Sequence, residues 1–538
     1  MTQMGSSGEA VSARLGVAAF PDGAELRRWT RRRTRRHRRG VWALVGDIYS
    51  GLLTIVVVGT ILVPHLSRLV AARPSSSSQE TAELGALDLD PGWLVLALMM
   101  LLLALGIGPL SRLGPLFLRP HELRPHEAAW WLPMPGDRGT LLVPVARVEY
   151  LIAATAGAVM GVLPALASAS GWGAAVAWPV LIAAGVCLVL SELITAQVQG
   201  RGVTRLRRFL ILLGAAACLA GTTFPFPRSM TGNMVVATLA GVLVAAGILR
   251  WRQARLILGH VRDDGLLTVV ARSFGAHVSL LSLDTRAVGR LLSPALPRPA
   301  APSPLRLAQI GRRLPRSVRV LTGVAQADWI LLRRQPRRLL QIGAGLAVAV
   351  LPLLSESVGI PMRALAYLAG GWIATLAVAE PARQAWFDGA ADTSWPVSPW
   401  LVRVGHLLVP GLFMSAWSLL SLAPAMTSLG AAGAWKALGV VAALALVSGW
   451  AWAGAALRSG FRAMPDFAAG LVTSPVGSLP PGLVQMLVEG PDAALVGALA
   501  TALVACGIAA PTTTVLGIQA AAGAVVILWG VRTNRRAS

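Results

Sequence analysis

Long apolar segments dominate the chain, and they decide which folds are open to it. Hydrophobic residues make up 55% of the 538 residues and charged residues 13%, whereas soluble domains carry about 25% charged residues. A helix that crosses the hydrocarbon core of a bilayer needs about 20 mainly apolar residues. We therefore expect an all-α, polytopic integral membrane protein with twelve spans. The predicted spans are 43–63, 94–114, 151–169, 174–194, 207–226, 233–250, 339–358, 363–380, 401–423, 436–457, 493–510 and 513–531.

The basic residues indicate which side of the membrane each loop occupies. The segment 26–40 carries nine arginines directly before the first span, and basic loops stay on the cytoplasmic side. If the spans alternate from there, the outside loops hold only five of the 48 basic residues, Arg68, Arg73, Arg228, Arg363 and Lys436. We expect a plasma-membrane protein with both termini in the cytoplasm and with anionic lipids as partners of its basic surface.

Six spans, a polar interval and six more spans indicate two halves. We expect a cytoplasmic amino terminus (1–40), a first six-span half (41–250), a connector (251–338), a second six-span half (339–531) and a cytoplasmic tail (532–538). Because six is even, the halves would be parallel repeats. The connector begins with amphipathic stretches and contains the Pro-rich linker SPALPRPAAPSP, so we expect interfacial or cytoplasmic helices there and no enzyme domain.

Each half also has a segment of Trp, Pro and charged residues between its second and third spans. We expect a cytoplasmic elbow at 118–150 and another at 381–400, because tryptophan favours the headgroup level and proline interrupts a helix. For the first elbow, an interfacial anchor without a partner is the alternative. The residues expected to form a partner-docking surface are Trp130, Trp131, Pro133, Pro135, Asp137, Arg138, Trp395, Pro396, Pro399 and Arg403.

Motifs for catalysis are missing from the sequence. A P-loop needs a lysine followed by Ser or Thr, and the single lysine stands in GAWKALG. In HELRPH at 121–126 the histidines are five residues apart, and Pro125 would break the helix that a zinc site needs. We therefore expect no metal, no cofactor and no enzymatic activity in the chain.

The remaining polar candidates have ordinary explanations. Asp47, Glu149 and Glu192 stand near the ends of predicted spans, where pairing with arginine accounts for them. No acidic residue stands at mid-depth in a predicted span, which counts against an ion-coupled carrier. We expect Cys187, Cys218 and Cys506 to be small packing residues. The arginine-rich arm lacks an accompanying nucleic-acid-binding fold, so we expect no nucleic acid partner.

The order of a basic lead-in, a span, an outside loop, a second span and an elbow with LPMPGDRGTLL at 132–142 resembles the type-2 ABC exporter permeases. In that family six spans form one half-transporter, and the elbow touches a separate ATPase subunit. The segment WPVSPWLVRVGHLL at 395–408 resembles the same elbow without its Asp-Arg pair. The chain as a whole also resembles an uncharacterised actinobacterial family of twelve-span membrane proteins. The resemblance implies two fused permease halves with an ATPase partner.

Three functions stay open on the sequence alone. The first is the permease subunit of an ABC-type exporter, which an associated ATPase would identify. The second is a non-transporting membrane scaffold or accessory protein, which would depend on the arginines of 27–39. The third is an ion-coupled secondary transporter, whose substrate flux would collapse with the ion gradient.

Overall fold

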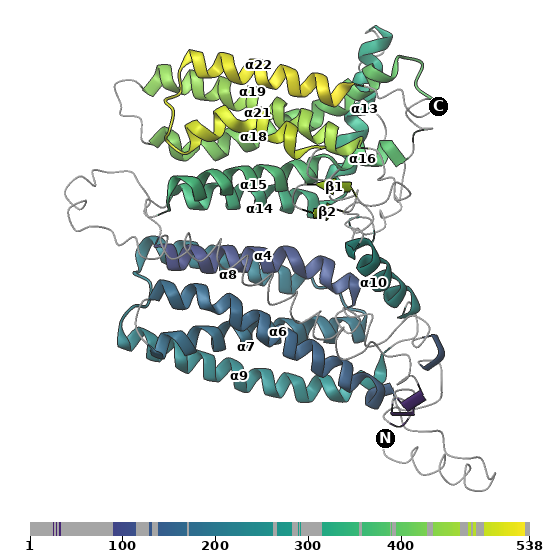
Figure 1. Ribbon diagram of the computed structural model, residues 1–538, viewed down its shortest axis with the longest axis vertical. Coiled ribbons are helices and arrows are strands. Elements are labelled where there is room, and N and C mark those ends of the chain that lie inside the picture. The colour runs from purple at the N-terminus through teal and green to yellow at the C-terminus, as the bar shows by residue number, and fades with distance from the viewer. Residues whose placement is uncertain are drawn as a thin grey trace. The chain divides into compact units, whose positions relative to one another are not determined.

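The computed structural model is a helical protein whose helices follow the apolar segments (Figure 1). The chain divides into two compact units. Unit 1 consists of Met1–Pro64, Gly106–Phe209 and Pro227–Val278, and unit 2 of His65–Leu105, Leu210–Phe226 and Ser279–Ser538. The residues that the structure describes are 90–114, 138–168, 172–261, 266–281, 315–354, 358–387, 394–427, 434–462, 472–474, 477–479 and 489–532, with the isolated positions 25, 28–29, 32–33, 129–131, 289, 291 and 389.

Unit 1 is built around three long helices, which are α6 (Arg138–Ser168), α7 (Trp172–Gln199) and α9 (Met230–Ile257). A short 3-10 helix, η4 (Leu258–His260), follows α9 directly, and most of α10 (Leu266–Leu281) belongs to the same unit. Two further helices, α4 (Pro91–Leu113) and α8 (Thr204–Thr223), contribute turns to both units.

Unit 2 contains the second half of the chain. Its elements are α13 (Arg316–Arg333), α14 (Pro336–Val350), η6 (Leu351–Leu354), α15 (Ile360–Val378), α16 (Glu380–Phe387), α18 (Pro399–Thr427), α19 (Ala434–Gly460), α21 (Pro491–Ala505) and α22 (Thr513–Val531). Among the described residues, the one departure from the helical fold is a short antiparallel pair, β1 (Val472–Ser474) with β2 (Gly477–Leu479), which the sequence did not predict.

The prediction of a helical multi-pass membrane protein is confirmed. Within the described residues nine helices are long and apolar enough to cross a membrane, or ten if α15 and α16, bent by 44°, form one span. The apolar helix α21 is shorter than these. Eleven of the twelve predicted spans coincide with a helix, and the first, 43–63, lies outside the described residues. The total of twelve spans therefore remains a prediction.

The two units pack their helices in the same order. In unit 1, α6 packs along α7, and α7 in turn packs along α9. In unit 2, α18 packs along α19, and α19 packs along α22. In terms of the predicted spans, both series join the third span of a half to the fourth and the fourth to the sixth. This shared order agrees with the predicted duplication, which otherwise stays a prediction.

Large aromatic side chains fill the centre of unit 2. Tyr367 of α15, Trp417 of α18 and Trp452 of α19 are buried. The ring centroids of Tyr367 and Trp417 lie 5.7 Å apart, and those of the two tryptophans lie 6.1 Å apart. Gly371 makes room for the Trp452 indole, because a Cβ atom at this position would overlap the ring. The bulk of these rings holds α15, α18 and α19 in one packed core.

Glycines instead bring α6 and α7 together in unit 1. Gly157 and Gly161 lie one turn apart on the face of α6 that contacts α7. A Cβ atom at Gly157 would lie 2.7 Å from the Ala183 Cα, and one at Gly161 would lie 2.5 Å from the Pro179 Cα. Small residues at this spacing let helix backbones approach closely in membranes, where dispersion contacts drive association.

Replacing Gly157 with leucine should lower the melting temperature of the purified protein, because the new side chain must push α6 away from α7. Overpacking of this kind costs about 1–3 kcal/mol. Gly241→Leu on α9 is the matched control, since no atom lies within 4 Å of a Cβ built there. Equal melting temperatures for the two variants would contradict the close helix contact.

Candidate functional site

In the first predicted elbow, one of two adjacent tryptophans is packed against the protein and the other is exposed. Residues 129–131 are helical, and Trp130 is 71% exposed. Trp131 packs against the buried cluster around Leu258 of η4. Trp130 is therefore available to a partner, while Trp131 holds the segment on unit 1. The other predicted docking residues of this segment, Pro133, Pro135 and Asp137, lie outside the described residues.

Arg138 joins this elbow to the beginning of the connector. It is the first residue of α6, and its Nη1 donates a hydrogen bond to the Val261 carbonyl at 3.3 Å. Val261 is buried in the same cluster as Leu141 and Leu258. The helix α6 thus begins within the range 118–150 predicted as elbow and continues unbroken into the predicted third span. A force on the elbow would act directly on this long helix.

The second predicted elbow, 381–400, begins as the helix α16, and its described part from 394 to 398 is a turn that rests on α13. The Trp395 carbonyl accepts a hydrogen bond from the Val397 amide at 2.8 Å. The Trp395 indole packs on α13 at Gly323, where a Cβ atom would lie 3.4 Å from its Cη2. Pro396 is exposed, and Pro399, also exposed, is the first residue of α18. Here too a tryptophan packs on a connector element while its neighbours face outward.

Arg403 is engaged inside unit 2. Its guanidinium lies over the Phe461 ring at 4.5 Å from the centroid, and its Nη1 donates to the Arg532 carbonyl. These contacts tie the start of α18 to the ends of α19 and α22. Arg403 is therefore an internal link, and the exposed residues of the described part of the second elbow include Pro396, Pro399 and Trp400, which is 54% exposed.

A buried acid–histidine pair fastens α13 to α18. The two oxygens of the Asp328 carboxylate lie 3.1 and 2.9 Å from His406 Nδ1. The side chains are only 4% and 7% exposed, respectively. Further along the same two helices Trp329 stacks on Phe413, with ring centroids 5.6 Å apart. The sequence alone did not reveal this pair, because its members stand 78 positions apart.

Ionic contacts also fasten α14 to the bend between α15 and α16. Glu380 is largely buried, and its Oε2 accepts hydrogen bonds from Arg338 at 2.5 Å and from Arg383 at 2.9 Å. Gln384 donates to its other oxygen at 3.2 Å. Arg383 also donates to the Leu376 carbonyl at 2.8 Å, near the end of α15. The carboxylate is thereby satisfied on both oxygens, as burial of a charge requires.

A third ionic contact joins α19 to α21. Arg458 Nη2 donates to Asp492 Oδ2 at 2.6 Å, and its Nε lies 3.2 Å from both carboxylate oxygens. The same guanidinium lies 5.2 Å from the ring centroid of Trp529 in α22. Asp492 in turn accepts hydrogen bonds from the backbone amides of Gly490 and Ala493 at the start of α21. Three helix ends meet at this arginine.

These contacts all lie at one end of unit 2. They involve the amino-terminal ends of α14, α18 and α21 and the carboxyl-terminal ends of α15, α19 and α22. Successive membrane spans run in opposite directions, so amino-terminal and carboxyl-terminal helix ends must alternate on one side of the membrane, as they do here. In unit 1, Arg250 of α9 pairs with Glu192 of α7 at 3.1 Å, about two turns before the carboxyl-terminal end of each helix. The predicted cytoplasmic side is thus the charged end of each unit.

The described polar contacts join helices to one another. Among the described residues, no group of three or more His, Cys, Asp or Glu side chains is placed to hold a metal ion. Cys187 and Cys218 are half-buried, Cys506 is buried, and all three are free thiols. His121, His126 and Asp47 lie outside the described residues. The candidate site therefore consists of helix ends joined by ion pairs and cation–π contacts, with exposed aromatic and proline side chains beside them.

Comparison with protein families places the chain in a family. The model of a family of unknown function (DUF6297) matches residues 86–470. This range covers more than half of the chain and spans both units, so the chain belongs to that family. The comparisons with curated proteins and with solved structures found no match.

The Asp328–His406 pair can be tested by a double-mutant cycle. We expect Asp328→Ala and His406→Ala each to destabilise the protein by about 1–3 kcal/mol, because each leaves a buried polar partner without its hydrogen bond. The double variant should be scarcely less stable than either single variant. Thermal melting in detergent gives the three values, and additive losses would show that the two side chains do not interact.

Proposed function

We propose that this member of DUF6297, an integral membrane protein, is the permease subunit of an exporter that a separate ABC ATPase energises. The observation that carries the proposal is the construction of the two elbows. In each, one tryptophan packs on an element of the connector while neighbouring side chains stay exposed, and a long apolar helix follows. A permease needs such a contact, because the motion of its motor must reach the membrane helices.

The two helices that follow the elbows are long enough for this task. α6 has 31 residues and α18 has 29, which correspond to roughly 46 and 44 Å at about 1.5 Å per residue. The hydrocarbon core is about 30 Å thick. Each helix can therefore cross the core and still project beyond it toward the charged end of its unit, where a soluble subunit could push on it.

The side-chain contacts between helices described above would transmit such a force to neighbouring helices. The Asp328–His406 pair couples α13 to α18, and Arg403 couples α18 to the ends of α19 and α22. Arg458 extends the connection to α21. Buried, hydrogen-bonded ion pairs resist separation, because parting them leaves a charge unpaired in a medium of low dielectric constant. Rigid-body motion is the expected response of helices that are joined in this way.

The sequence favours an energy source in a partner. Nucleotide hydrolysis through a P-loop needs a lysine in a Gly-rich turn, and the single lysine of the chain stands elsewhere.

One observation favours a second candidate, a proton-coupled carrier. The buried Asp328–His406 pair contains two protonatable groups, and buried ionisable groups commonly form proton relays in transporters. A carrier would move its substrate in vesicles that contain this chain alone, driven by an imposed pH gradient. The permease would be inactive there until the ATPase is added.

The permease proposal predicts that an ABC ATPase accompanies the chain. After purification from native membranes in mild detergent with ATP and vanadate, we expect mass spectrometry to identify an ATPase with a P-loop. Trp130→Glu should reduce its recovery severalfold. Trp172→Glu is the matched control, because Trp172 is 90% exposed at the opposite end of unit 1. Absence of an ATPase, or equal loss in both variants, would contradict the proposal.

A further inference from the structure

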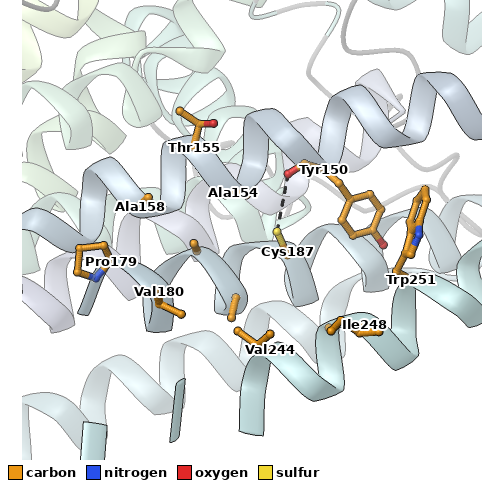
Figure 2. A pocket seen from close by; sticks show the side chains of 13 residues that line it. Tyr150, Ala154, Thr155, Ala158, Pro179, Val180, Cys187, Val244, Ile248 and Trp251 are labelled. Carbon is orange, nitrogen blue, oxygen red and sulfur yellow. Dashed lines mark hydrogen bonds between the residues drawn. The ribbon is translucent and has the colours of Figure 1, made fainter. Parts of the chain in front are cut away.

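Unit 1 contains an apolar groove between three of its helices. α7 forms the floor, α6 and α9 form the walls, and the volume is about 550 Å³ (Figure 2). Ala154 and Ala158 line the α6 wall, Val244 and Ile248 line the α9 wall, and Cys187 rises from the floor. Cys187 donates a hydrogen bond to the Tyr150 carbonyl at 3.8 Å, so its polar hydrogen is used within the protein. The groove surface is consequently almost free of polar groups.

Small side chains keep the groove open. α6 and α9 both pack along α7 but touch each other little. Where they face one another, the lining residues include Ala154, Ala158 and Gly247. No atom lies within 4 Å of a Cβ built at Gly247. The space between the walls is therefore not closed by side chains of the surrounding helices.

In unit 2 large side chains fill the meeting place of three helices near the charged end. There α18, α19 and α22 pack in the same order, and a hydrophobic cluster occupies the place where the three helices meet. The cluster contains Leu407 of α18, Trp450 and Leu457 of α19, and Ile527 of α22.

One end of the groove is aromatic and basic. Trp251 meets Tyr150 edge to face, with ring centroids 4.7 Å apart, and closes the groove there. Beyond this pair, at the charged end of the unit, lie three arginines of α9 and one glutamate of α7. They are Arg250, Arg252, Arg255 and Glu192. All three arginines are exposed, and Arg250 is paired with Glu192. The positive charge exceeds the negative charge at this end.

We propose that the groove holds one acyl chain of an anionic membrane phospholipid, with the headgroup at the arginines of α9. The apolar walls lie on membrane-spanning helices, so lipid chains surround the groove. Tryptophan at its end suits the headgroup level, and clusters of arginine attract anionic headgroups. The charge at this end selects an anionic lipid over a zwitterionic one. This site does not depend on whether an ATPase drives the protein.

Photolabelling in vesicles tests the chain-binding part of the proposal. The full chain is placed in phosphatidylcholine vesicles with a small fraction of phosphatidylglycerol that carries a diazirine on one acyl chain. We expect adducts on the segments of α6, α7 and α9 that line the groove. Gly247→Phe should reduce these adducts about fivefold or more by filling the groove, and Val244→Phe should act in the same way from the same wall.

Gly241→Phe is the matched control for the plugging variants. Gly241 is exposed on the same helix, does not line the groove, and has no atom within 4 Å of a built Cβ. Its adducts in the groove should equal those of the wild type. Adduct yields that are unchanged in Gly247→Phe and Val244→Phe, or the absence of groove adducts in the wild type, would overturn the proposal.

Two further arms test the headgroup and the occupant. The same diazirine on phosphatidylcholine should give at least about fivefold fewer groove adducts, since even one arginine near a headgroup favours anionic lipid by about that factor. Equal yields would overturn the headgroup assignment. In a variant that keeps Cys187 as its only cysteine, a cross-link from Cys187 to residues 43–63 or to a second copy would show that a protein helix fills the groove, and would overturn the lipid assignment.

Discussion

Hydrocarbon accepts neither a charge nor an unpaired backbone group without a large cost in free energy, and the rest of this structure depends on that constraint. It makes each apolar segment a helix, and it places the charged side chains at the helix ends. In unit 2 the ionic contacts involve alternate termini of successive helices. The constraint thus gathers charged side chains at one end of each unit.

Within this frame, side-chain size distinguishes the two units. In unit 2 buried tryptophans fill the centre, and a second hydrophobic cluster occupies the space between α18 and α22. In unit 1 the glycines of α6 bring two backbones together, and alanines leave the neighbouring space open. One packing order therefore accommodates buried aromatic side chains in unit 2 and an open groove in unit 1.

Much of the fold followed from the sequence, because length and hydropathy identify a membrane helix almost independently of its neighbours. The elbows were placed only approximately. α6 begins at Arg138, within the range predicted as elbow, since LLVP at 141–144 is compatible with a continuous helix. The link between each elbow tryptophan and the connector was not predicted, because a tryptophan in a polar segment does not reveal the surface on which it packs.

The contacts that could not be predicted from the sequence are those between distant positions. Asp328 and His406 look unremarkable in their own segments, as do Arg338 and Glu380, and only the packing of α13 and α14 brings each pair together. The groove gave no signal for a different reason. Its alanines and Gly247 are ordinary residues of a membrane helix, and they form a surface only when three helices place them side by side.

Both elbows can serve one motor only if the charged ends of both units lie on the same side of the membrane. Single cysteines at Trp130, Trp172, Ile360 and Pro396, in a background without Cys187, Cys218 and Cys506, measure this with an impermeant maleimide. We expect Trp130→Cys and Pro396→Cys to react only from the cytoplasm, and Trp172→Cys and Ile360→Cys only from outside. Labelling of Trp130→Cys and Pro396→Cys from opposite sides would contradict the account.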